Sequence, residues 1–368
     1  MTTTRKPRIL SIFPGFVIGG AQARFAAVAN HFGAEWQHII FSLNGALDCR
    51  ERLAPGLDVS FAEPALIKGD TRGNLARIRR FLRATAPDVL VTHNWGSMEW
   101  AMANALFPLV RHVHIEDGFG PEERVRQLPR RVWTRRLVLR RSHVVLPSQT
   151  LMTIARDIWK LPERALTYIP NGVDLDRLTP APRIQTDTPI IGTVAALRPE
   201  KNLARLLRAF HLLRQTTAAR LVIVGDGAQR SELQQLAVTL GIAGDVEFTG
   251  HQPDPLAQLQ RFDIFALSSD TEQMPISVLE AMAMQLPVAA TNVGDVRAML
   301  AVEARCCVVE QDDAALASVL RNLVQEPARR LQIGAANRLA VEARFSAEQM
   351  FESYRSMLLS AGAGQAKG

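Results

Sequence analysis

The stretch Ile264-Phe-Ala-Leu-Ser-Ser-Asp-Thr-Glu-Gln-Met-Pro-Ile-Ser-Val-Leu-Glu-Ala-Met-Ala283 holds one strand, one loop and one helix. It opens with a short apolar run, continues as a polar loop and turns apolar again after Pro275, a residue type favoured in the first turn of a helix. Glu280 lies about one and a half turns inside this predicted helix, among apolar neighbours. Such strand and helix units are typical of parallel sheets.

The same alternation of short apolar runs and amphipathic stretches occurs twice along the chain. We therefore expect an α/β protein of two doubly wound domains. In the first half, the expected strands are Ile9–Phe13, His38–Phe41, Val89–Thr92, Val110–His114 and His143–Leu146, and helices start near Gly20, Thr71, Gly96 and Pro121. In the second half, the expected strands are Ile190–Val194, Leu221–Gly225, Val246–Phe248, Ile264–Leu267, Pro287–Ala290 and Cys306–Val309, and helices start at Asn202, Gln229, Ile276 and Asp312.

The domain boundary is expected where Pro, Asn and Gly concentrate, in the stretch Ile169–Pro182. We predict a first domain over residues 1–170, a linker over 171–187 and a second domain over 188–345. A last helix over 346–360 is expected to pack back toward the first domain, and residues 361–368 are expected to be a disordered tail.

Charge is distributed unevenly over the 368 residues. Residues 1–175 carry 24 Lys and Arg against 15 Asp and Glu, whereas residues 176–368 carry 19 against 21, so all of the net charge of +7 lies in the first half. This asymmetry predicts that the first half faces something anionic. No apolar run is long enough to cross a membrane, so we expect a protein that is cytoplasmic or peripheral on the inner face of the membrane. The three cysteines lack the spacing of a zinc site or a disulfide framework.

Two loops at predicted strand ends have the composition of phosphate-binding loops. Gly19 and Gly20 lie at a helix start, where backbone N–H groups and the helix dipole favour an anion, although a plain tight turn fits equally well. Arg198 and Lys201 lie three residues apart just before a helix that Asn202 can cap. Together these two cations suit a diphosphate, whereas taken alone they fit an ordinary surface loop.

Glu272 and Glu280 are the carboxylates of the quoted stretch. A carboxylate among apolar neighbours is unfavourable unless it has a partner, and carboxylates accept hydrogen bonds from vicinal hydroxyl groups. One of the two glutamates is therefore predicted to hold a ribose and the other a sugar, with the backbone N–H groups between them facing a diphosphate.

The spacing of Glu272 and Glu280 resembles the two-glutamate signature of the retaining glycosyltransferase family 4, whose fold is called GT-B. The resemblance extends over nearly the whole chain, more clearly in the second half than in the first. It rests further on Gly19-Gly20, Ile169-Pro-Asn-Gly-Val-Asp174, Arg198-Pro-Glu-Lys-Asn202, Val222-Ile-Val-Gly-Asp-Gly227, Val246-Glu-Phe-Thr-Gly250 and Leu286-Pro-Val-Ala-Ala-Thr-Asn-Val-Gly294. It implies two facing Rossmann-like domains with a cleft between them, and a nucleotide diphosphate sugar as donor.

The resemblance also implies roles for individual residues of the donor site. Arg198 and Lys201 would bind the diphosphate, Glu280 the ribose and Glu272 the transferred sugar, while Gly19 and Gly20 close on the phosphate from the opposite domain. Gln273, Met274, Pro275 and Ile276 complete the donor-binding stretch, and Gln273-Met274 replaces the Gly-Phe that is common in the family. The resemblance also implies that the leaving phosphate takes the acceptor proton, so no dedicated nucleophile is expected. No metal is expected either, because Arg198 and Lys201 would supply the positive charge and no cluster of Asp and Glu accompanies them.

Two loops of the first half carry polar residues that suit an acceptor. His93 and Asn94 end one strand, and His114, Glu116 and Asp117 end the next. The resemblance assigns His114 to a histidine near the reacting centre, so His114, Asp117 and Glu272 are the catalytic candidates, while His93, Asn94 and Glu116 are candidates for contact with the acceptor hydroxyl.

A basic segment between Arg124 and Arg141 carries eight arginines and no acid. Anionic lipid, a lipid-linked pyrophosphate acceptor or nucleic acid would each suit its charge, and nucleic acid is the weakest choice because no recognition motif accompanies it. Arg130, Arg131, Arg135 and Arg136 are the predicted membrane contacts. A plain solvated helix fits the segment nearly as well.

Together these features predict transfer of a sugar from a UDP- or GDP-sugar to a glycan or a lipid-linked acceptor. A nucleotide-sugar 2-epimerase of the same fold and a non-catalytic basic binding module are the alternatives. A dehydrogenase is disfavoured because Arg230 stands where a dinucleotide-binding loop needs its third glycine. We assign no metal to the pair Asp174 and Asp176, which lies in the predicted linker.

Overall fold

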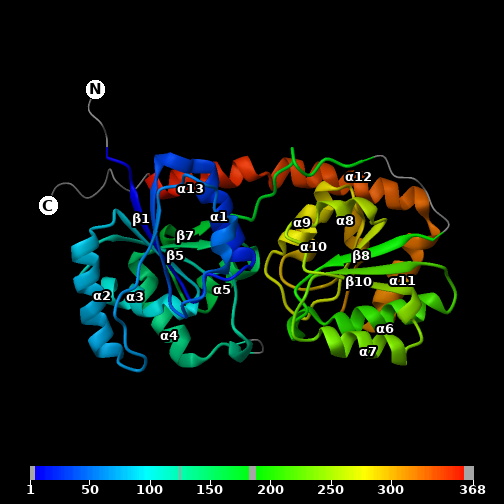
Figure 1. Cartoon of the computed structure of the whole chain (residues 1–368), viewed down its shortest axis with the longest axis horizontal. Helices are drawn as coiled ribbons and strands as arrows, with labels where there is room; N and C mark the ends of the chain where they lie inside the picture. Colours follow the sequence, from blue (N-terminus) through cyan, green and yellow to red (C-terminus); the bar gives the residue numbers. More distant parts are fainter. Residues whose placement is uncertain (1–4, 124–125, 182–187, 360–368) are drawn as a thin grey trace. The chain divides into compact units, whose positions relative to one another are not determined.

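The structure is a computed structural model that describes residues 5–123, 126–181 and 188–359. The chain forms two compact units (Figure 1): unit 1 contains residues 1–170 and 351–368, and unit 2 contains residues 171–350. The predicted tail at 361–368 and the end of the predicted linker, 182–187, lie outside the described residues.

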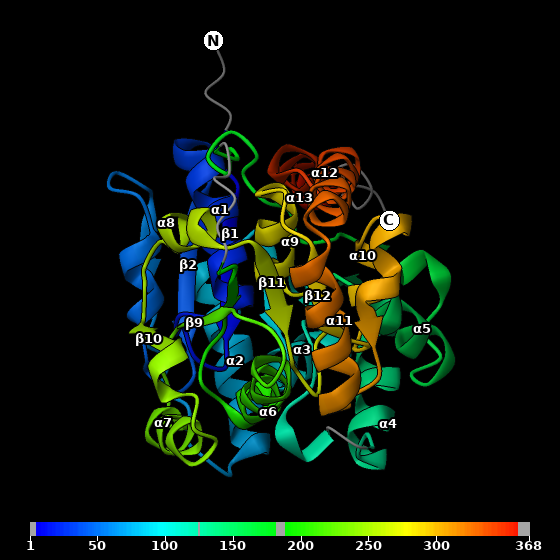
Figure 2. The ribbon, with the colours of Figure 1, turned by 90° about the vertical axis from the view of Figure 1, so that its right-hand side faces the viewer.

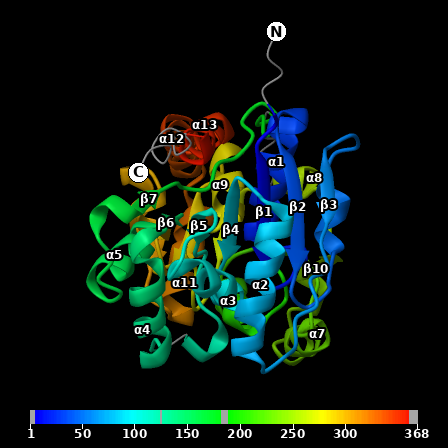
Figure 3. The ribbon, with the colours of Figure 1, turned by 90° about the vertical axis from the view of Figure 1, so that its left-hand side faces the viewer.

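Unit 1 is built on a seven-stranded parallel sheet with the strand order β3-β2-β1-β4-β5-β6-β7 (Figure 3). Its strands are β1 (Arg8–Phe13), β2 (Gln37–Ser42), β3 (Val59–Phe61), β4 (Val89–His93), β5 (Arg111–Ile115), β6 (His143–Leu146) and β7 (Leu166–Tyr168). Its helices include α1 (Gly20–Phe32), α2 (Thr71–Thr85), α3 (Met98–Ala105), α4 (Pro129–Val138) and α5 (Gln149–Asp157). All of β4 is buried, as expected of a central parallel strand covered on both faces.

Unit 2 is built on a six-stranded sheet with the order β10-β9-β8-β11-β12-β13 (Figure 2). Its strands are β8 (Ile190–Val194), β9 (Arg220–Val224), β10 (Val246–Gly250), β11 (Ile264–Leu267), β12 (Val288–Thr291) and β13 (Val308–Val309). Its helices are α6 (Leu203–Arg214), α7 (Arg230–Thr239), α8 (Leu256–Arg261), α9 (Ile276–Ala283), α10 (Val296–Met299), α11 (Asp313–Gln325) and α12 (Pro327–Arg344). One continuous apolar core joins the sheet to these helices.

The last helix, α13 (Ala347–Leu359), runs from unit 2 into unit 1. From Phe351 onward it packs on unit 1, where the Phe351 ring stacks on His31 with 4.1 Å between the ring centroids. The Arg111 guanidinium, on β5, donates a hydrogen bond to the carbonyl oxygen of Leu358 at 2.7 Å. Unit 1 is therefore assembled from both ends of the chain.

The α/β class and both parallel sheets agree with the sequence prediction, but several local expectations were wrong. The short strands β3 and β7 were not predicted, because three residues show no clear periodicity. The helix expected from Pro121 is a single 3-10 turn, and α4 begins only at Pro129. Of the strand expected at Cys306–Val309, only Val308–Val309 is extended, because a 3-10 helix reaches to Cys307.

Among the described residues, no helix has both the length and the apolar character needed to cross a bilayer.

Candidate active site

The donor-site candidates lie where the strand order of unit 2 reverses. Strand β8 has β9 on one side and β11 on the other, so the loops after β8 and β11 leave the sheet in different directions. Ligands of doubly wound sheets bind outside the carboxyl ends of the strands at this point. Arg198 and Lys201 follow β8, and Glu272 follows β11, as the sequence predicted.

Lys201 and Glu272 form an ion pair, which the sequence did not predict. The Lys201 ammonium donates to Oε1 of Glu272 at 2.6 Å, and the Ser269 hydroxyl donates to the same oxygen at 2.7 Å. The Glu272 side chain is only 9% exposed, and no described residue is bonded to its Oε2. One oxygen of this carboxylate is therefore held by the protein, while the other can accept a hydrogen bond from a ligand.

Arg198 precedes a short 3-10 turn, Pro199–Lys201, and Lys201 is the last residue of this turn, just before α6. Asn202 caps α6 as predicted, since its side chain accepts a hydrogen bond from the N–H of Arg205. Arg198 is exposed, and its guanidinium has no ion-pair partner among the described residues. Lys201 is thus the cation already paired at the site, and Arg198 is the one open to an anion.

The backbone carbonyl groups of the donor loop, residues 268–274, are held from outside the loop. Each accepting carbonyl belongs to a different residue, and each donor comes from another segment of unit 2. The donor and acceptor pairs are Arg205 to Ser268 (2.8 Å), Thr291 to Ser269 (2.6 Å), Gln311 to Asp270 (3.1 Å), the Asp295 N–H to Gln273 (2.9 Å) and Asn171 to Met274 (2.7 Å). The loop therefore has little freedom to change its backbone conformation.

This arrangement leaves backbone N–H groups available for a ligand. In a trans peptide the N–H points away from the carbonyl, so fixing the carbonyl groups also fixes the direction of the neighbouring N–H groups. Among the described residues, the N–H groups without an acceptor include those of Thr271, Glu272 and Met274 in the loop and those of Ile276 and Ser277 in the first turn of α9. Such a cluster at a helix start favours a phosphate.

Glu280 lies one turn further along the same face of α9. Ile276, Ser277 and Glu280 are half-buried, whereas the other residues of this helix are buried. The backbone of α9 therefore presents its open N–H groups and the Glu280 carboxylate on one side, which suits a ligand with a phosphate and a diol. Met274 and Pro275 are buried, and Gln273 is half-buried at the loop.

Gly294 allows another segment to approach the donor loop. A Cβ atom on Gly294 would lie 2.3 Å from the carbonyl oxygen of Glu272, and its backbone φ of +51° is one that side-chain-bearing residues rarely adopt. This explains why a glycine follows Asn292-Val293 here, and it ties the position of Glu272 to the loop after β12.

In unit 1, Gly19 caps α1 and Gly20 is its first residue, so backbone N–H groups are open at this helix start as predicted. Arg24, one turn further on, forms a buried ion pair with Asp117 at 2.5 Å. The Asp117 N–H donates to the Asn94 side chain at 2.7 Å, which joins the ends of β4 and β5. Asn94 and Asp117 are half-buried, and they are the acceptor-site candidates that reach the surface.

The catalytic candidate His114 and the acceptor candidate Glu116 are both fully buried, so neither reaches a ligand at the surface as expected. Thr92 lies at the centre of the polar chain behind them, with its hydroxyl 2.8 Å from both His114 Nδ1 and His112 Nε2. On the other side Glu116 accepts from the Arg135 guanidinium at 3.1 Å. Burial and the nearby His114 lower the pKa of His112 to about 3. The His112 member of this hydrogen-bonded series is therefore a neutral imidazole.

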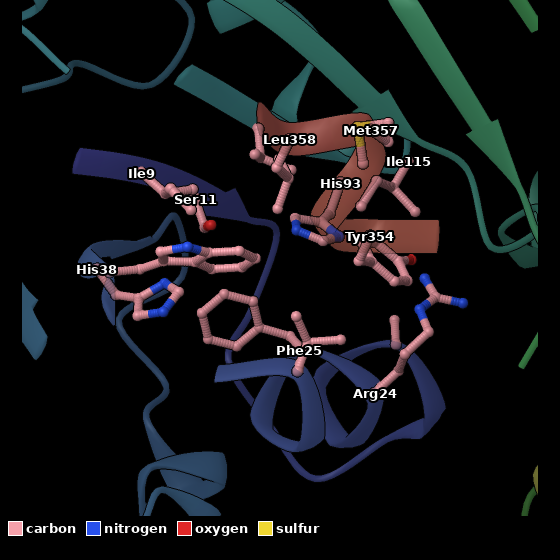
Figure 4. Close-up of a pocket in the computed structure, with 14 residues that line it drawn as sticks. Ile9, Ser11, Arg24, Phe25, His38, His93, Ile115, Tyr354, Met357 and Leu358 are labelled. Atoms are coloured by element: carbon pink, nitrogen blue, oxygen red, sulfur yellow. The ribbon is translucent and has the colours of Figure 1, made fainter. Parts of the chain in front are cut away.

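His93 is also enclosed, in the wall of a small cavity beneath α1 and α13 (Figure 4). Its ring stacks on Phe13 at 3.9 Å, and neither of its ring nitrogens, nor those of His38, is bonded to a described residue. Ser11 and Tyr354 also line the cavity. The space inside it that water can reach is about 30 Å³, which suits one or two water molecules. His93 is only 2% exposed, so the expectation that it contacts the acceptor was wrong.

The basic segment is divided between the interior and the surface. Arg135 is fully buried against Trp159, Trp95 and Glu116, and Arg131 is buried against Glu122 and Glu123. The prediction that Arg131 and Arg135 contact a membrane was therefore wrong, because acids outside the segment bind both. Arg130 is exposed and Arg136 stacks on the exposed Trp133 at 5.2 Å, while Arg124 lies outside the described residues.

Several residues that shape the site were not found from the sequence. Asn171, Ser269, Thr291 and Gln311 bind atoms of the donor loop, yet each is a common polar residue with no distinctive spacing. Asn171, Ser269 and Thr291 lie in stretches that the sequence pattern singled out, but no role was assigned to them there, and Gln311 carried no signal. Within the described residues, no three His, Cys, Asp or Glu side chains gather as a metal site would require.

Two family models match adjacent parts of the chain. The model described as Glycosyltransferase Family 4 matches residues 18–177, and the model described as Glycosyl transferases group 1 matches residues 176–340. The matched regions meet where unit 1 gives way to unit 2 along the chain.

Curated proteins of similar sequence include bacterial glycosyltransferases. The chain is 33% identical over 214 residues to a GDP-mannose-dependent monoacylated alpha-(1-6)-phosphatidylinositol monomannoside mannosyltransferase of Corynebacterium glutamicum, a match that covers 52% of this chain and 56% of the relative. It is 27% identical over 209 residues to the lipopolysaccharide core biosynthesis glycosyltransferase LpsE of Rhizobium meliloti, covering 55% of this chain and 59% of the relative. The chain thus spans little more than half the length of these relatives.

Solved structures of similar fold cover nearly the whole chain. A glycosyltransferase of Rickettsia africae aligns with a TM-score of 0.79 at 17% identity, covering 98% of this chain and 100% of that one. Anabaena HepE in complex with UDP aligns with a TM-score of 0.79 at 18% identity, covering 96% of this chain and 100% of that one. At this identity, the likeness establishes the fold, which is GT-B.

Proposed function

Because the matching models together span residues 18–340, the chain belongs to glycosyltransferase family 4, and we propose that it transfers a sugar from a nucleotide diphosphate sugar to a hydroxyl group of a glycan or a lipid-linked acceptor. UDP- and GDP-sugars are both candidate donors, since similar proteins are named for GDP-mannose and a protein of similar fold binds UDP. Cell-surface polysaccharide or glycolipid synthesis would use such a reaction.

The observation that carries this proposal is the combination of Lys201, Glu272 and the fixed donor loop. Lys201 and Arg198 supply positive charge, the open N–H groups at the start of α9 supply donors for phosphate oxygens, and Oε2 of Glu272 supplies an acceptor for a sugar hydroxyl. Glu280 lies where a carboxylate can accept from a ribose. In this proposal unit 2 holds the donor, and Asn94 and Asp117 of unit 1 face the acceptor.

The proposed reaction retains the configuration of the anomeric carbon. The bond between the acceptor oxygen and the anomeric carbon forms on the same face of the sugar from which the bond to the diphosphate breaks. The acceptor proton passes to the leaving phosphate oxygen, so no protein nucleophile takes part. Arg198, Lys201 and the loop N–H groups stabilise the negative charge that develops on the diphosphate, and they do so without a metal.

A panel of UDP- and GDP-sugars tests this proposal. One donor should raise the melting temperature, because a ligand that binds only the folded state stabilises it. With that donor and a glycolipid extract, NMR should show a product with the anomeric configuration of the donor, at the same rate in EDTA. An inverted product, or activity that EDTA abolishes and manganese restores, would contradict the mechanism. A free 2-epimer formed without acceptor would indicate the epimerase instead.

We further propose that α4 docks on an anionic membrane surface and brings unit 1 to a lipid-linked acceptor. The support comes from exposed side chains. Trp133 and Leu137 are 58% and 65% exposed, one turn apart on α4, and both are apolar. Exposed Arg130, Arg140 and Arg141 accompany them. Exposed apolar side chains with arginines before and after them are typical of helices that lie at a lipid interface.

The docking proposal predicts a loss of vesicle binding when three exposed arginines are neutralised. Each arginine near an anionic surface contributes about 1 kcal/mol, so the triple change Arg130→Gln, Arg140→Gln and Arg141→Gln should weaken binding to phosphatidylglycerol vesicles on the order of 100-fold. Vesicle sedimentation measures this.

A matched control removes the same charge from α2 of unit 1. Arg72, Arg80 and Arg83 are exposed there, and their replacement by glutamine should leave most of the vesicle binding intact. An equal loss in both triple variants would mean that net charge, rather than α4, attracts the vesicles. Equal binding of the unmodified protein to neutral and anionic vesicles would overturn the docking proposal altogether.

A further inference from the structure

The Pro-Asn-Gly turn that the sequence places in the linker is bonded to the donor loop. The Asn171 side chain is 7% exposed, and its amide donates to the carbonyl oxygen of Met274 at 2.7 Å. The Asn171 backbone N–H also points at the sulfur of Met274, with 3.3 Å between nitrogen and sulfur. The first residue of unit 2 is thus bonded twice to a residue 103 positions later, at the end of the donor loop.

The same turn is bonded to the segment that leads out of unit 2. The Gly172 N–H points at the sulfur of Met350, at 3.3 Å. The Val173 N–H donates to Phe345 at 3.0 Å, and the Ala347 N–H donates back to Val173 at 2.9 Å, so that Val173 and Ser346 form a parallel bridge. A Cβ atom on Gly172 would lie 2.6 Å from the carbonyl oxygen of Ser346, which explains the glycine. The entering and leaving segments therefore form a short two-stranded junction.

Asn171 joins this junction to the donor loop. Residues 171–173 bond to residues 345–350 on one side and to Met274 on the other. The Met274 carbonyl immediately precedes Pro275 and α9, whose first N–H groups are open. This carbonyl belongs to the peptide bond with Pro275, which has no N–H, but its position sets where the first turn of α9 begins. A shift of this peptide would therefore move the N–H groups of Ile276 and Ser277, and it would also pull on Asn171.

We infer that Asn171 is a positioning residue that couples nucleotide binding at the donor loop to the junction of residues 171–173 and 345–347. The inference rests on the proposed function, since it needs a nucleotide at the donor loop. A bound diphosphate restrains the small remaining motion of the Met274 peptide, the Met274 carbonyl then holds the Asn171 amide more tightly, and the junction opens less often. Because coupling between sites is reciprocal, loosening the junction also weakens nucleotide binding.

Hydrogen exchange of two junction amides tests the coupling. In the unmodified chain, saturating UDP or GDP should slow the exchange of the Val173 and Ala347 amides about 5-fold or more, the lower end of usual coupling between sites. In the Asn171→Ala variant the amides should exchange at the same rate with and without nucleotide, and the nucleotide should bind about 5-fold more weakly. Asn171→Asp, which keeps the shape but loses the donor, should behave like the alanine variant.

Asn337 provides the matched control. It is a fully buried asparagine of unit 2 whose side chain donates to the carbonyl oxygen of Leu286 at 3.0 Å, away from the donor loop. Asn337→Ala should lower the melting temperature yet keep the nucleotide-dependent slowing at Val173 and Ala347. If both variants lose the slowing, Asn171 has only a structural role.

The outcomes separate this inference from the proposed function. If neither UDP nor GDP binds the unmodified chain, the proposed function fails first. If a nucleotide binds and leaves the exchange of Val173 and Ala347 unchanged, the proposed function stands and the coupling through Asn171 is wrong.

Discussion

Replacing Lys201 with methionine should weaken binding of the nucleotide diphosphate about 10-fold or more, whereas replacing Glu272 with glutamine should leave that binding unchanged or make it tighter. Lys201 would lose a charge-assisted bond to the diphosphate, a contact worth about 1.5–3 kcal/mol. Glu272 has the opposite effect, because its carboxylate lies 2.6 Å from the Lys201 ammonium and partly neutralises it. Isothermal titration with UDP and GDP measures both changes.

Sugar transfer should respond differently from nucleotide binding. Glu272→Gln should lower kcat about 10- to 100-fold, since a neutral amide holds a sugar hydroxyl more weakly than a carboxylate does. Lys201→Arg keeps the charge and should recover part of the affinity lost in Lys201→Met. Arg198→Gln should weaken nucleotide binding in the same direction as Lys201→Met. Unchanged affinity in both the Lys201 and the Arg198 variants would refute the proposed diphosphate site.

Acid should unfold unit 1 before unit 2, between about pH 6.5 and pH 4. Burial lowers the pKa of His38 to about 4 and that of His112 to about 3, and it lowers the pKa of His93 and His143 as well. These pKa values are lower in the folded state than in the unfolded chain, so the unfolded chain binds protons first as the pH falls below 6.5. The free energy of unfolding therefore decreases from that pH down to the pKa of each histidine in the folded state. His38 alone accounts for roughly 3 kcal/mol.

Tryptophan fluorescence distinguishes the units in this experiment. All five tryptophans lie in unit 1, whereas circular dichroism at 222 nm reports both units. We expect the fluorescence midpoint at a higher pH than the last part of the circular dichroism change. His38→Phe should move the fluorescence midpoint to lower pH, because it removes a buried titrating group whose ring nitrogens lack a described partner. His251→Gln, at an exposed position of unit 2, serves as the control. Coincident transitions at every pH would refute the prediction.

The elements that the sequence predicted well are those with long buried runs. The strands around Ile9, Val89 and Ile264 are mainly apolar and buried, and a glycine or a proline marks the start of α1 and of α9. The three-residue strands β3 and β7 are formed by pairing with neighbours rather than by local preference, so their own sequence does not reveal them.

The donor site was predictable in its residues but not in its contacts. Arg198 and Lys201 follow β8, Glu272 follows β11 and Glu280 lies inside α9, and this placement can be read from the pattern. The bond between Lys201 and Glu272 joins residues 71 positions apart, and no local pattern reports it.

The basic segment shows the same limit. Arg131 and Arg135 are one helical turn apart, which places them on one face, but only the structure shows that Glu116, Glu122 and Glu123 lie against that face. A charge count over the segment alone therefore overstated the charge that reaches the surface.

The contribution of α13 to unit 1 affects how the protein folds during synthesis. Phe351, Tyr354, Met357 and Leu358 are buried in unit 1, so the surface they cover on α1 and the sheet stays open until the ribosome has added them. Unit 2 lies between the two parts of unit 1 along the chain, so all of it has emerged from the ribosome before the end of α13 does. Although most of unit 1 is synthesised first, unit 2 can complete its core earlier, and the nascent chain closes unit 1 last.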